Sequence, residues 1–307
     1  MNRRAISSHR GEASVRILRG LVLAAGLFAV SCGDSPNNPG PVNNPPPPPP
    51  PPVNNTAPVI SSITVQGTRR NEPPNFADLS ETVPLTVTVT DAETPVDQLQ
   101  YTWTASVGTF TGTGTRVSWI APAEAVTPAT ATLTLEVIER YGTNQQNRVT
   151  VTATVAVHNS VKEVGDMARV FLQEFSDSSM RDSALIVRNF TDATKTCANG
   201  KSAESGEIAQ NRIDYRITSS SLGTPNVSID FGGICAFRAK PGDACARVPA
   251  AWTSIRLTPG GVTPVNGTER VNGTDQVTAI YLRDQRKWGL CESDFDGARG
   301  LRTSFIR

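Results

Sequence analysis

The sequence predicts a multi-domain protein in which an all-β sandwich precedes an α+β domain. Between Pro58 and His158, short segments alternate apolar residues with threonine and are separated by Gly, Pro and Asp, which is typical of antiparallel strands. From Ser160 onward the apolar period changes from two residues to about 3.6, and alternating segments return later. The 307 residues allow about two domains.

The N-terminus has the features of an export signal. Several arginines precede an apolar run from Leu21 to Val30, which Ser31 and Cys32 follow. A basic segment, a short apolar segment and a small residue before the cleavage point form a secretory signal peptide. The run is shorter than the roughly 20 apolar residues that a membrane-spanning helix needs. We therefore expect residues 1–31 to be removed.

The segment Phe28-Ala29-Val30-Ser31-Cys32 resembles the lipobox of bacterial lipoproteins, with Ala29 where that family usually has Leu. The resemblance implies that Cys32 carries acyl chains, including palmitate, which hold the protein on a membrane. Asp34 is separated from Cys32 by Gly33, whereas the inner-membrane retention signal of enteric bacteria places Asp directly after the Cys. This favours the outer membrane of a bacterial cell envelope, on its periplasmic face or at the cell surface.

A proline-rich tether is predicted at residues 32–57. It has no apolar periodicity and contains the unbroken run Pro45 to Pro52. Eight prolines in polyproline II geometry span about 25 Å and resist collapse. The segment therefore predicts a stiff spacer between the membrane and the folded part, with a ligand for a proline-recognition domain as the alternative.

The β-sandwich is predicted at residues 58–158. In the segment from Leu85 to Thr90 the apolar residues share one face and the threonines share the other. About six or seven strands in roughly 100 residues match the size of one immunoglobulin-like domain. The expected strands run from Ile60 to Val65, Leu85 to Thr90, Leu99 to Thr104, Arg116 to Ile120, Ala131 to Val137 and Val149 to Val157.

This stretch resembles the polycystic kidney disease (PKD) domain and related bacterial immunoglobulin-like domains. The matching pieces are Ala57-Pro58-Val59-Ile60, Asp91, Asp97-Gln98-Leu99-Gln100-Tyr101-Thr102-Trp103, Gly108-Thr109-Phe110, Trp119-Ile120-Ala121-Pro122, and Leu133 to Val137 before Gly142. No Cys pair joins the two sheets, and Glu139 stands where the family usually has Asp before a late turn.

An α+β domain is predicted at residues 160–307, with helices packed on a mostly antiparallel, curved sheet. An apolar stripe and a capping box formed by Ser160 and Glu163 predict an amphipathic helix over 160–175. Further helices are expected near Arg181 to Phe190 and Ser202 to Arg212. The expected strands run from Ile213 to Ser219, Asn226 to Phe231, Ala250 to Leu257, Gln276 to Arg283 and Lys287 to Glu292, with a turn at Asp284-Gln285-Arg286 and hairpin signals at Asn266-Gly267 and Asn272-Gly273.

The order of these elements resembles the nuclear transport factor 2-like (SnoaL-like) fold, in which a curved sheet wraps a helix and leaves a pocket. The resemblance makes Tyr215, Trp252, Tyr281 and Trp288 candidate ligand-binding residues, because each falls on a predicted strand. Packing in the core is the alternative for these four side chains.

Four cysteines are left for disulfides once Cys32 is assigned to lipid. An even number of cysteines in an oxidising compartment predicts two bonds, and four cysteines allow three pairings. We favour Cys235 with Cys245 and Cys197 with Cys291. Zinc is the alternative, but the sequence has no C-x-x-C spacing and no nearby His.

Three carboxylates in one loop of the sandwich, Asp91, Glu93 and Asp97, form a candidate calcium site, because calcium prefers hard oxygen ligands. The alternative is that these residues form turns through hydrogen bonds to the backbone. Their spacing is not that of an EF-hand, and no other cofactor is expected.

Catalytic signals are sparse. Glu292, Asp294 and Asp296 are interpreted as a solvated acidic loop rather than as the carboxylate pair of a glycoside hydrolase. His158 is interpreted as part of the linker between domains rather than as a base. No G-x-S-x-G elbow, P-loop or dinucleotide fingerprint occurs.

The charge balance limits the partners. With 29 Lys and Arg against 28 Asp and Glu the net charge is +1, and it becomes −3 without residues 1–31, so nucleic acid is not expected as a partner. The first hypothesis is a lipid-anchored, non-enzymatic protein that binds an envelope protein, a glycan or a small molecule. The alternatives are an extracytoplasmic enzyme with a pocket in the C-terminal domain and an adhesive surface protein that acts through the sandwich.

Overall fold

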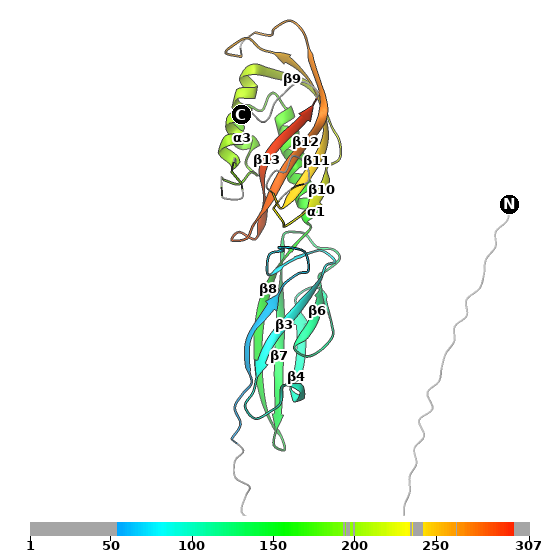
Figure 1. The fold of residues 1–307 in the computed structure, drawn as a ribbon, viewed down its shortest axis with the longest axis vertical. Helices are drawn as coiled ribbons and strands as arrows, with labels where there is room; N and C mark the ends of the chain where they lie inside the picture. Colours follow the sequence, from blue (N-terminus) through cyan, green and yellow to red (C-terminus); the bar gives the residue numbers. More distant parts are fainter. Residues whose placement is uncertain are drawn as a thin grey trace, which may run out of the picture. The chain divides into compact units, whose positions relative to one another are not determined.

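The computed structural model describes residues 54–297, apart from residues 193, 195, 196, 199, 234, 236–241 and 262. The predicted signal peptide, Cys32 and the proline run lie outside the described residues. The described part is mostly β-sheet with a few helices (Figure 1). Within this part, no helix has the length and apolar character needed to cross a membrane.

Residues 54–158 form two four-stranded sheets. The first has the order β1 (Val59–Val65), β3 (Thr82–Thr90), β6 (Arg116–Ile120) and β5 (Thr109–Thr111). The second has the order β2 (Phe76–Asp78), β8 (Gln145–His158), β7 (Ala129–Tyr141) and β4 (Gln100–Ala105), and the 3-10 turn η1 (Val96–Gln98) precedes β4. All neighbours are antiparallel except β2 and β8.

The alternation of the sequence explains how this sandwich closes. Along β3, every second side chain is buried and every other one is exposed. The inward residues of both sheets share one apolar core, in which Trp119 and Leu135 are fully buried. The indole N–H of Trp119 donates to the Val107 carbonyl oxygen at 3.1 Å. Glycine is required at Gly108, which has a φ of +80° and where a Cβ would lie 2.6 Å from that indole nitrogen.

Residues 160–297 form a five-stranded antiparallel sheet with helices on it. The helices are α1 (Ser160–Ser176), α2 (Ser183–Ile186) and α3 (Gly200–Asp214). The strands are β9 (Tyr215–Leu222), β10 (Asn226–Ile229), β11 (Ala244–Arg256), β12 (Glu269–Leu282) and β13 (Lys287–Gly297). The sheet order is β10-β11-β12-β13, and β9 pairs with β11 beyond the end of β10.

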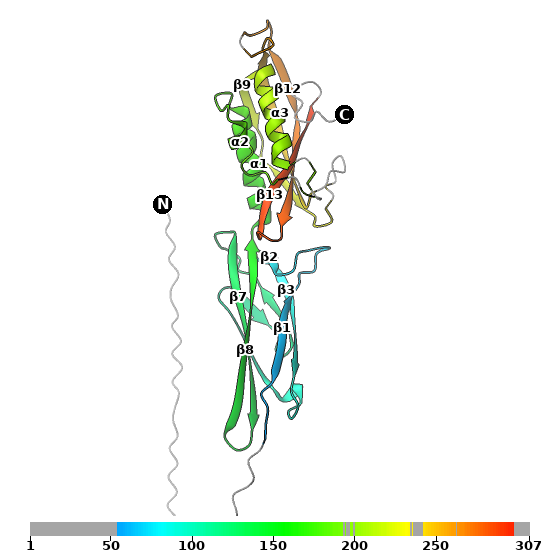
Figure 2. The ribbon, with the colours of Figure 1, turned by 90° about the vertical axis from the view of Figure 1, so that its left-hand side faces the viewer.

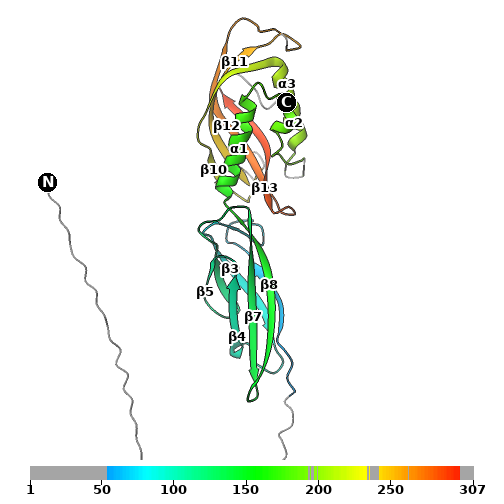
Figure 3. The ribbon, with the colours of Figure 1, turned by 180° about the vertical axis from the view of Figure 1, so that it is seen from behind.

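The interior of this sheet is filled. Helix α1 lies against its face (Figure 3), and α3 lies beside β13 (Figure 2). Phe175 of α1 meets Trp252 edge to face, with ring centroids 5.7 Å apart. Both side chains are buried in one apolar cluster with residues of all three helices and of the sheet. The space enclosed by helix and sheet is therefore a packed core.

Two disulfides fasten this domain. Cys197 is bonded to Cys291, and Cys235 is bonded to Cys245, with Cα atoms 5.5 and 5.8 Å apart respectively. This is the pairing that the sequence favours, and the first bond joins residues 94 positions apart.

Some expectations for individual elements are wrong. The N-cap of α1 is Asn159, whose side chain accepts the Lys162 N–H, so the predicted capping box at Ser160 lies one residue too late. The helix expected over 181–190 is the single turn α2. Asn272-Gly273 lies inside β12 rather than in a turn. Glycine is needed there for close approach of the two strands, because a Cβ at Gly273 would lie 2.1 Å from the Asp296 carbonyl oxygen of β13.

Candidate functional site

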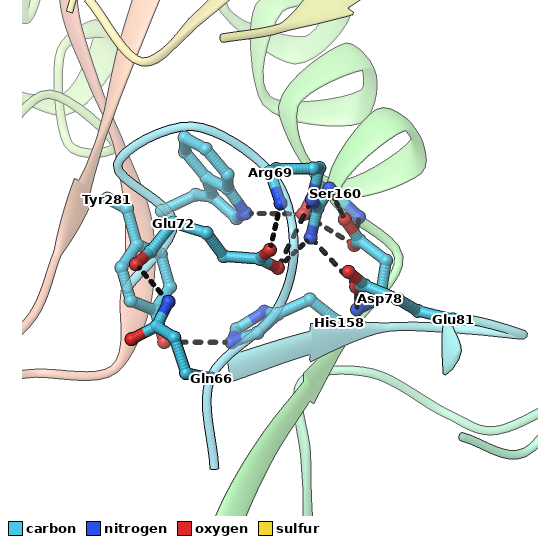
Figure 4. Close-up of polar contacts among 9 residues, drawn as sticks. Gln66, Arg69, Glu72, Asp78, Glu81, His158, Ser160 and Tyr281 are labelled. Atoms are coloured by element: carbon cyan, nitrogen blue, oxygen red, sulfur yellow. Dashed lines mark hydrogen bonds and ion pairs between the residues drawn. The ribbon is translucent and has the colours of Figure 1, made fainter. Parts of the chain in front are cut away.

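Three carboxylates surround the guanidinium of Arg69, which lies in the loop between β1 and β2. Arg69 contacts Glu72 at 2.5 Å, Asp78 at 2.7 Å and Glu81 at 2.8 Å (Figure 4). The side chain of Glu72 is fully buried, and Arg69 is one-third exposed. The backbone N–H of Asp78 also donates to Glu81 at 2.8 Å. One cation therefore holds three carboxylates at the end of the sandwich.

This cluster changes the acidity of its members. Burial alone would lower the pKa of Arg69, but its hydrogen bonds to Glu72 and Asp78 and the charge of Glu81 raise it above the ordinary value. Burial raises the pKa of the Glu81 carboxyl to about 7, although the Asp78 N–H and the Arg69 charge act in the opposite direction. The cluster is therefore sensitive to pH near neutrality.

Asp78 connects the cluster to the C-terminal domain. Its Oδ1 accepts the backbone N–H of Ser160 at 2.8 Å and the Ser160 hydroxyl at 2.6 Å (Figure 4). The indole N–H of Trp288 in β13 donates to the same hydroxyl oxygen at 3.0 Å. The first residue of α1 thus joins a carboxylate of the sandwich to a tryptophan of the sheet.

His158 lies inside this junction and is fully buried. Its Nδ1 lies 2.9 Å from Glu163 Oε2, and its Nε2 lies 3.3 Å from the Tyr281 hydroxyl (Figure 4). Burial would raise the pKa of Glu163, but the hydrogen bond and charge of His158 lower it below the ordinary value. The interpretation of His158 as a linker residue is wrong: it belongs to the last position of β8 and to the core of the junction.

Aromatic rings surround this histidine. Phe76 of β2 stacks on the imidazole, with centroids 5.1 Å apart and an interplanar angle of 8°. The same ring meets Tyr281 and Phe231 edge to face at 4.9 and 5.3 Å. Although Phe76 belongs to a sandwich strand, it packs in the apolar cluster of the C-terminal domain. The guanidinium of Arg69 covers Phe76 and Phe231 at 5.3 and 5.0 Å from their centroids.

The turn between β12 and β13 adds a second set of bonds across the junction. Arg286 donates to the carbonyl oxygens of Asn75 and Thr154 at 3.3 and 3.1 Å and to the Thr154 hydroxyl at 3.2 Å. Arg283 donates to the Asn71 carbonyl oxygen at 3.4 Å. These bonds and the aromatic packing hold residues 54–158 and 160–297 together.

Glu163, His158 and Tyr281 form the series carboxylate, imidazole and hydroxyl, which also occurs in sites that activate a nucleophile. Here Tyr281 is only 7% exposed, and burial raises its pKa to about 12. The hydroxyl therefore stays protonated near neutral pH and lies 3.3 Å from the buried imidazole. The series orients side chains within the junction.

A cavity of about 820 Å³ lies beside the junction. It is lined by the sandwich loop at residues 125–128, the first half of α1, residues 188–192, Lys201 at the start of α3, and the turn between β12 and β13. Its volume is within the range of small-molecule sites. Glu163 and Trp288, which bond to His158 and Ser160, also line it.

The structure brings together two of the four aromatic residues predicted to bind a ligand. The rings of Tyr281 and Trp288 lie 5.4 Å apart at the junction, and both are mostly buried. Trp252 lies away from them, against Phe175, and its indole N–H donates to Ser176. Tyr215 is half-buried at the start of β9 and packs against the same apolar cluster.

The predicted calcium loop uses its carboxylates within the protein. Asp91 Oδ1 accepts the N–H groups of Glu93 and Thr94 at 3.0 and 2.6 Å, as in an Asx turn. Glu93 accepts the Thr56 hydroxyl at 2.6 Å, and Asp97 belongs to η1. Among the described residues, no group of three His, Cys, Asp or Glu side chains is placed to hold a metal ion.

The acidic residues near the end of the chain do not form a solvated loop. Glu292, Asp294 and Asp296 lie on β13, and the first two are 9% and 5% exposed. Between them, the backbone N–H of Ser293 donates to Glu204 at 2.8 Å. Burial raises the pKa of Glu204 well above its ordinary value. The expectation failed because β13 continues to Gly297 and α3 covers it.

No protein-family model and no curated protein matches the chain.

Proposed function

We propose that this protein is a lipid-anchored component of a bacterial envelope that binds a small molecule without transforming it. The lipobox-like segment ending at Cys32 and the proline run Pro45 to Pro52 support an acylated anchor with a stiff spacer. The outer membrane is the proposed location, since Asp34 does not directly follow the Cys.

The cavity beside the junction is the observation that supports binding most strongly. Three carboxylates line it, Glu163, Asp166 and Asp192. Glu163 is bonded to His158, and Asp166 is paired with Lys162 and Arg169. Catalysis by a pair of carboxylates requires two such groups that face the substrate and are free to exchange protons. A cavity with only one such carboxylate favours binding over catalysis.

The finer identity of the two domains belongs to the same proposal. Two four-stranded sheets with a buried Trp119 are compatible with an immunoglobulin-like spacer of the PKD type. Helices followed by an antiparallel sheet are compatible with a nuclear transport factor 2-like domain. In this proposal the ligand site lies at the junction, because the interior of the C-terminal sheet is filled.

Fractionation of cells that express the full chain tests the anchor. Cys32→Ser removes the acylated thiol and should move the protein out of the membrane fraction. Ser31→Ala keeps a small residue before the Cys and should leave the protein on the membrane. Equal membrane retention of both variants would refute lipidation.

Native mass spectrometry of the protein purified from its own envelope tests binding. We expect a bound small molecule that is recovered chemically unchanged. It should be lost in Val126→Trp, because Val126 lines the cavity and is 93% exposed, so that the larger indole would occupy the space of the ligand. Val59→Trp is the control, since Val59 is 63% exposed on β1 and does not line the cavity. Turnover of the molecule would favour the enzyme, and an empty wild-type protein would contradict binding.

A further inference from the structure

The charges that line the junction cavity are not balanced. Lys162 is paired with Asp166, and Arg188 holds Glu174 through two ion-pair contacts, one of them at 2.6 Å. Lys201 and Lys287 also line the cavity, and neither forms an ion pair with a described residue. Among the described residues that line the cavity, Asp192 is left as the single carboxylate against these two cations.

Lys201 has an unusual position for a basic residue. It is the second residue of α3, whose first turn contains no acidic side chain. The backbone N–H groups and dipole of a helix already place partial positive charge at its N-terminus, so a cation there is unfavourable and an anion is favourable. An anion bound beside Lys201 would remove this repulsion.

Backbone hydrogen bonds hold the start of α3 against β13. The Lys201 N–H donates to the Thr191 carbonyl oxygen at 2.7 Å, and the Thr191 N–H donates to the Leu290 carbonyl oxygen at 2.7 Å. A Cβ placed on Gly289 would lie 3.5 Å from the Thr191 Cβ. The segment that carries Lys201 is thus fixed next to the strand that begins with Lys287.

The same cavity has an apolar side. Val126 is 93% exposed, and Met167 and Leu282 line the cavity while only partly buried. Exposing an apolar side chain to water costs free energy, and an apolar ligand that covers Val126 would remove part of this cost. Apolar side chains beside uncompensated cations match a ligand with an apolar body and an anionic head group.

We propose that the junction cavity binds an amphiphilic anion, whose head group contacts Lys201 and Lys287 and whose apolar chain covers Val126 and Met167. The proposal rests on the proposed function and names the chemical class of its ligand. Lys162 and Arg188 take no direct part, because each is already paired with a carboxylate.

Calorimetric titration with three probes that share a twelve-carbon chain tests the proposal. The protein is the exported chain without lipid, residues 33–307, which keeps every described residue. Dodecanoate should bind at least about tenfold more tightly than dodecyltrimethylammonium or dodecyl maltoside, all at concentrations below micelle formation. Lys201→Gln and Lys287→Gln should each weaken dodecanoate about five- to tenfold and leave the neutral probe unchanged.

Two control variants distinguish failure of the proposed ligand class from failure of the proposed binding function. Arg116→Gln removes a cation of the sandwich that does not line the cavity and should not change dodecanoate binding. If the cationic or neutral probe binds as tightly as dodecanoate and Val126→Trp blocks it, the proposed preference for an anionic head group is contradicted, although the cavity still binds ligands. If Val126→Trp blocks none of the probes, an amphiphile is the wrong class. Native mass spectrometry of the protein purified from its envelope then tests the proposed function separately.

Discussion

The sandwich core and the junction are both buried, but they are built differently. The sandwich core consists of apolar side chains from strands such as β3, along which buried and exposed residues alternate. The junction places Arg69, three carboxylates and His158 among aromatic rings from both domains. Apolar burial tolerates many arrangements of similar volume, whereas a buried polar group is stable only if its particular partners are present. We therefore expect the two regions to respond differently to substitution and to pH.

The largest effect is expected in the sandwich. Trp119→Ala should lower the free energy of unfolding by about 3–5 kcal/mol, because a fully buried indole leaves a cavity. The loss should be the same at pH 5 and pH 8, since the buried residues that form this core cluster are apolar. Urea unfolding at both pH values measures it, with the exposed Val126→Ala expected to stay within about 0.5 kcal/mol of the wild type.

The disulfides should differ by the length of chain that they close. Replacing both Cys197 and Cys291 by Ala opens a loop of 94 residues and should cost about 4.5 kcal/mol, by the entropy that the bond removes from the unfolded chain. Replacing both Cys235 and Cys245 opens a loop of 10 and should cost about 2–3 kcal/mol. Equal losses would contradict the loop-entropy explanation.

At the junction, Arg69→Met should cost about 2 kcal/mol at pH 8, because three carboxylates lose their common cation. Because the Arg69 side chain is one-third exposed to water, this cost in unfolding free energy should be smaller than that of removing a fully buried ion-pair partner. Unlike the sandwich variant, the loss should shrink at pH 5, where Glu81 becomes protonated. If the stability loss of Arg69→Met is the same at both pH values, the expected difference between the junction and the sandwich core is contradicted.

Glu81 should give a measurable pH slope. Its pKa is about 7 in the folded chain and about 4.5 when unfolded, so the folded state binds more protons between these values. The free energy of unfolding should therefore rise as pH falls from 7 to 4.5, by at most about 1.4 kcal/mol per pH unit. Glu81→Gln should remove this part of the slope, and Glu204 and Asp243, whose pKa values burial also raises, stay the same in both proteins. Identical slopes would contradict the assignment.

The strands of the sandwich were largely predictable, because each one follows from local alternation. The predicted strand Arg116 to Ile120 agrees with β6, and the segment Leu85 to Thr90 lies within β3. The short strands β2 and β5 were missed, since three residues give no periodicity. In β2, Phe76 pairs in the sandwich but packs with the other domain, which no local pattern indicates.

The site could be predicted only in part. Tyr281 and Trp288 were candidates because aromatic residues on strands suggest a lined pocket, and they do meet at the junction. Arg69 gave no signal, since its three partners come from a loop, a short strand and the turn after it, which only the tertiary fold brings together. His158, one of two histidines in the chain, is placed directly before the helix cap, but the sequence analysis interpreted it as a linker residue.

Hydrogen exchange of the wild type and of Phe76→Ala tests most directly the claim that the junction joins the two domains. Phe76 belongs to a sandwich strand but packs against Tyr281 and Phe231. We expect that removing its ring lowers amide protection in β12 and β13 about tenfold or more, together with β2 and β8. Loss of protection confined to β2 and β8 would show that the domains are not joined in this way.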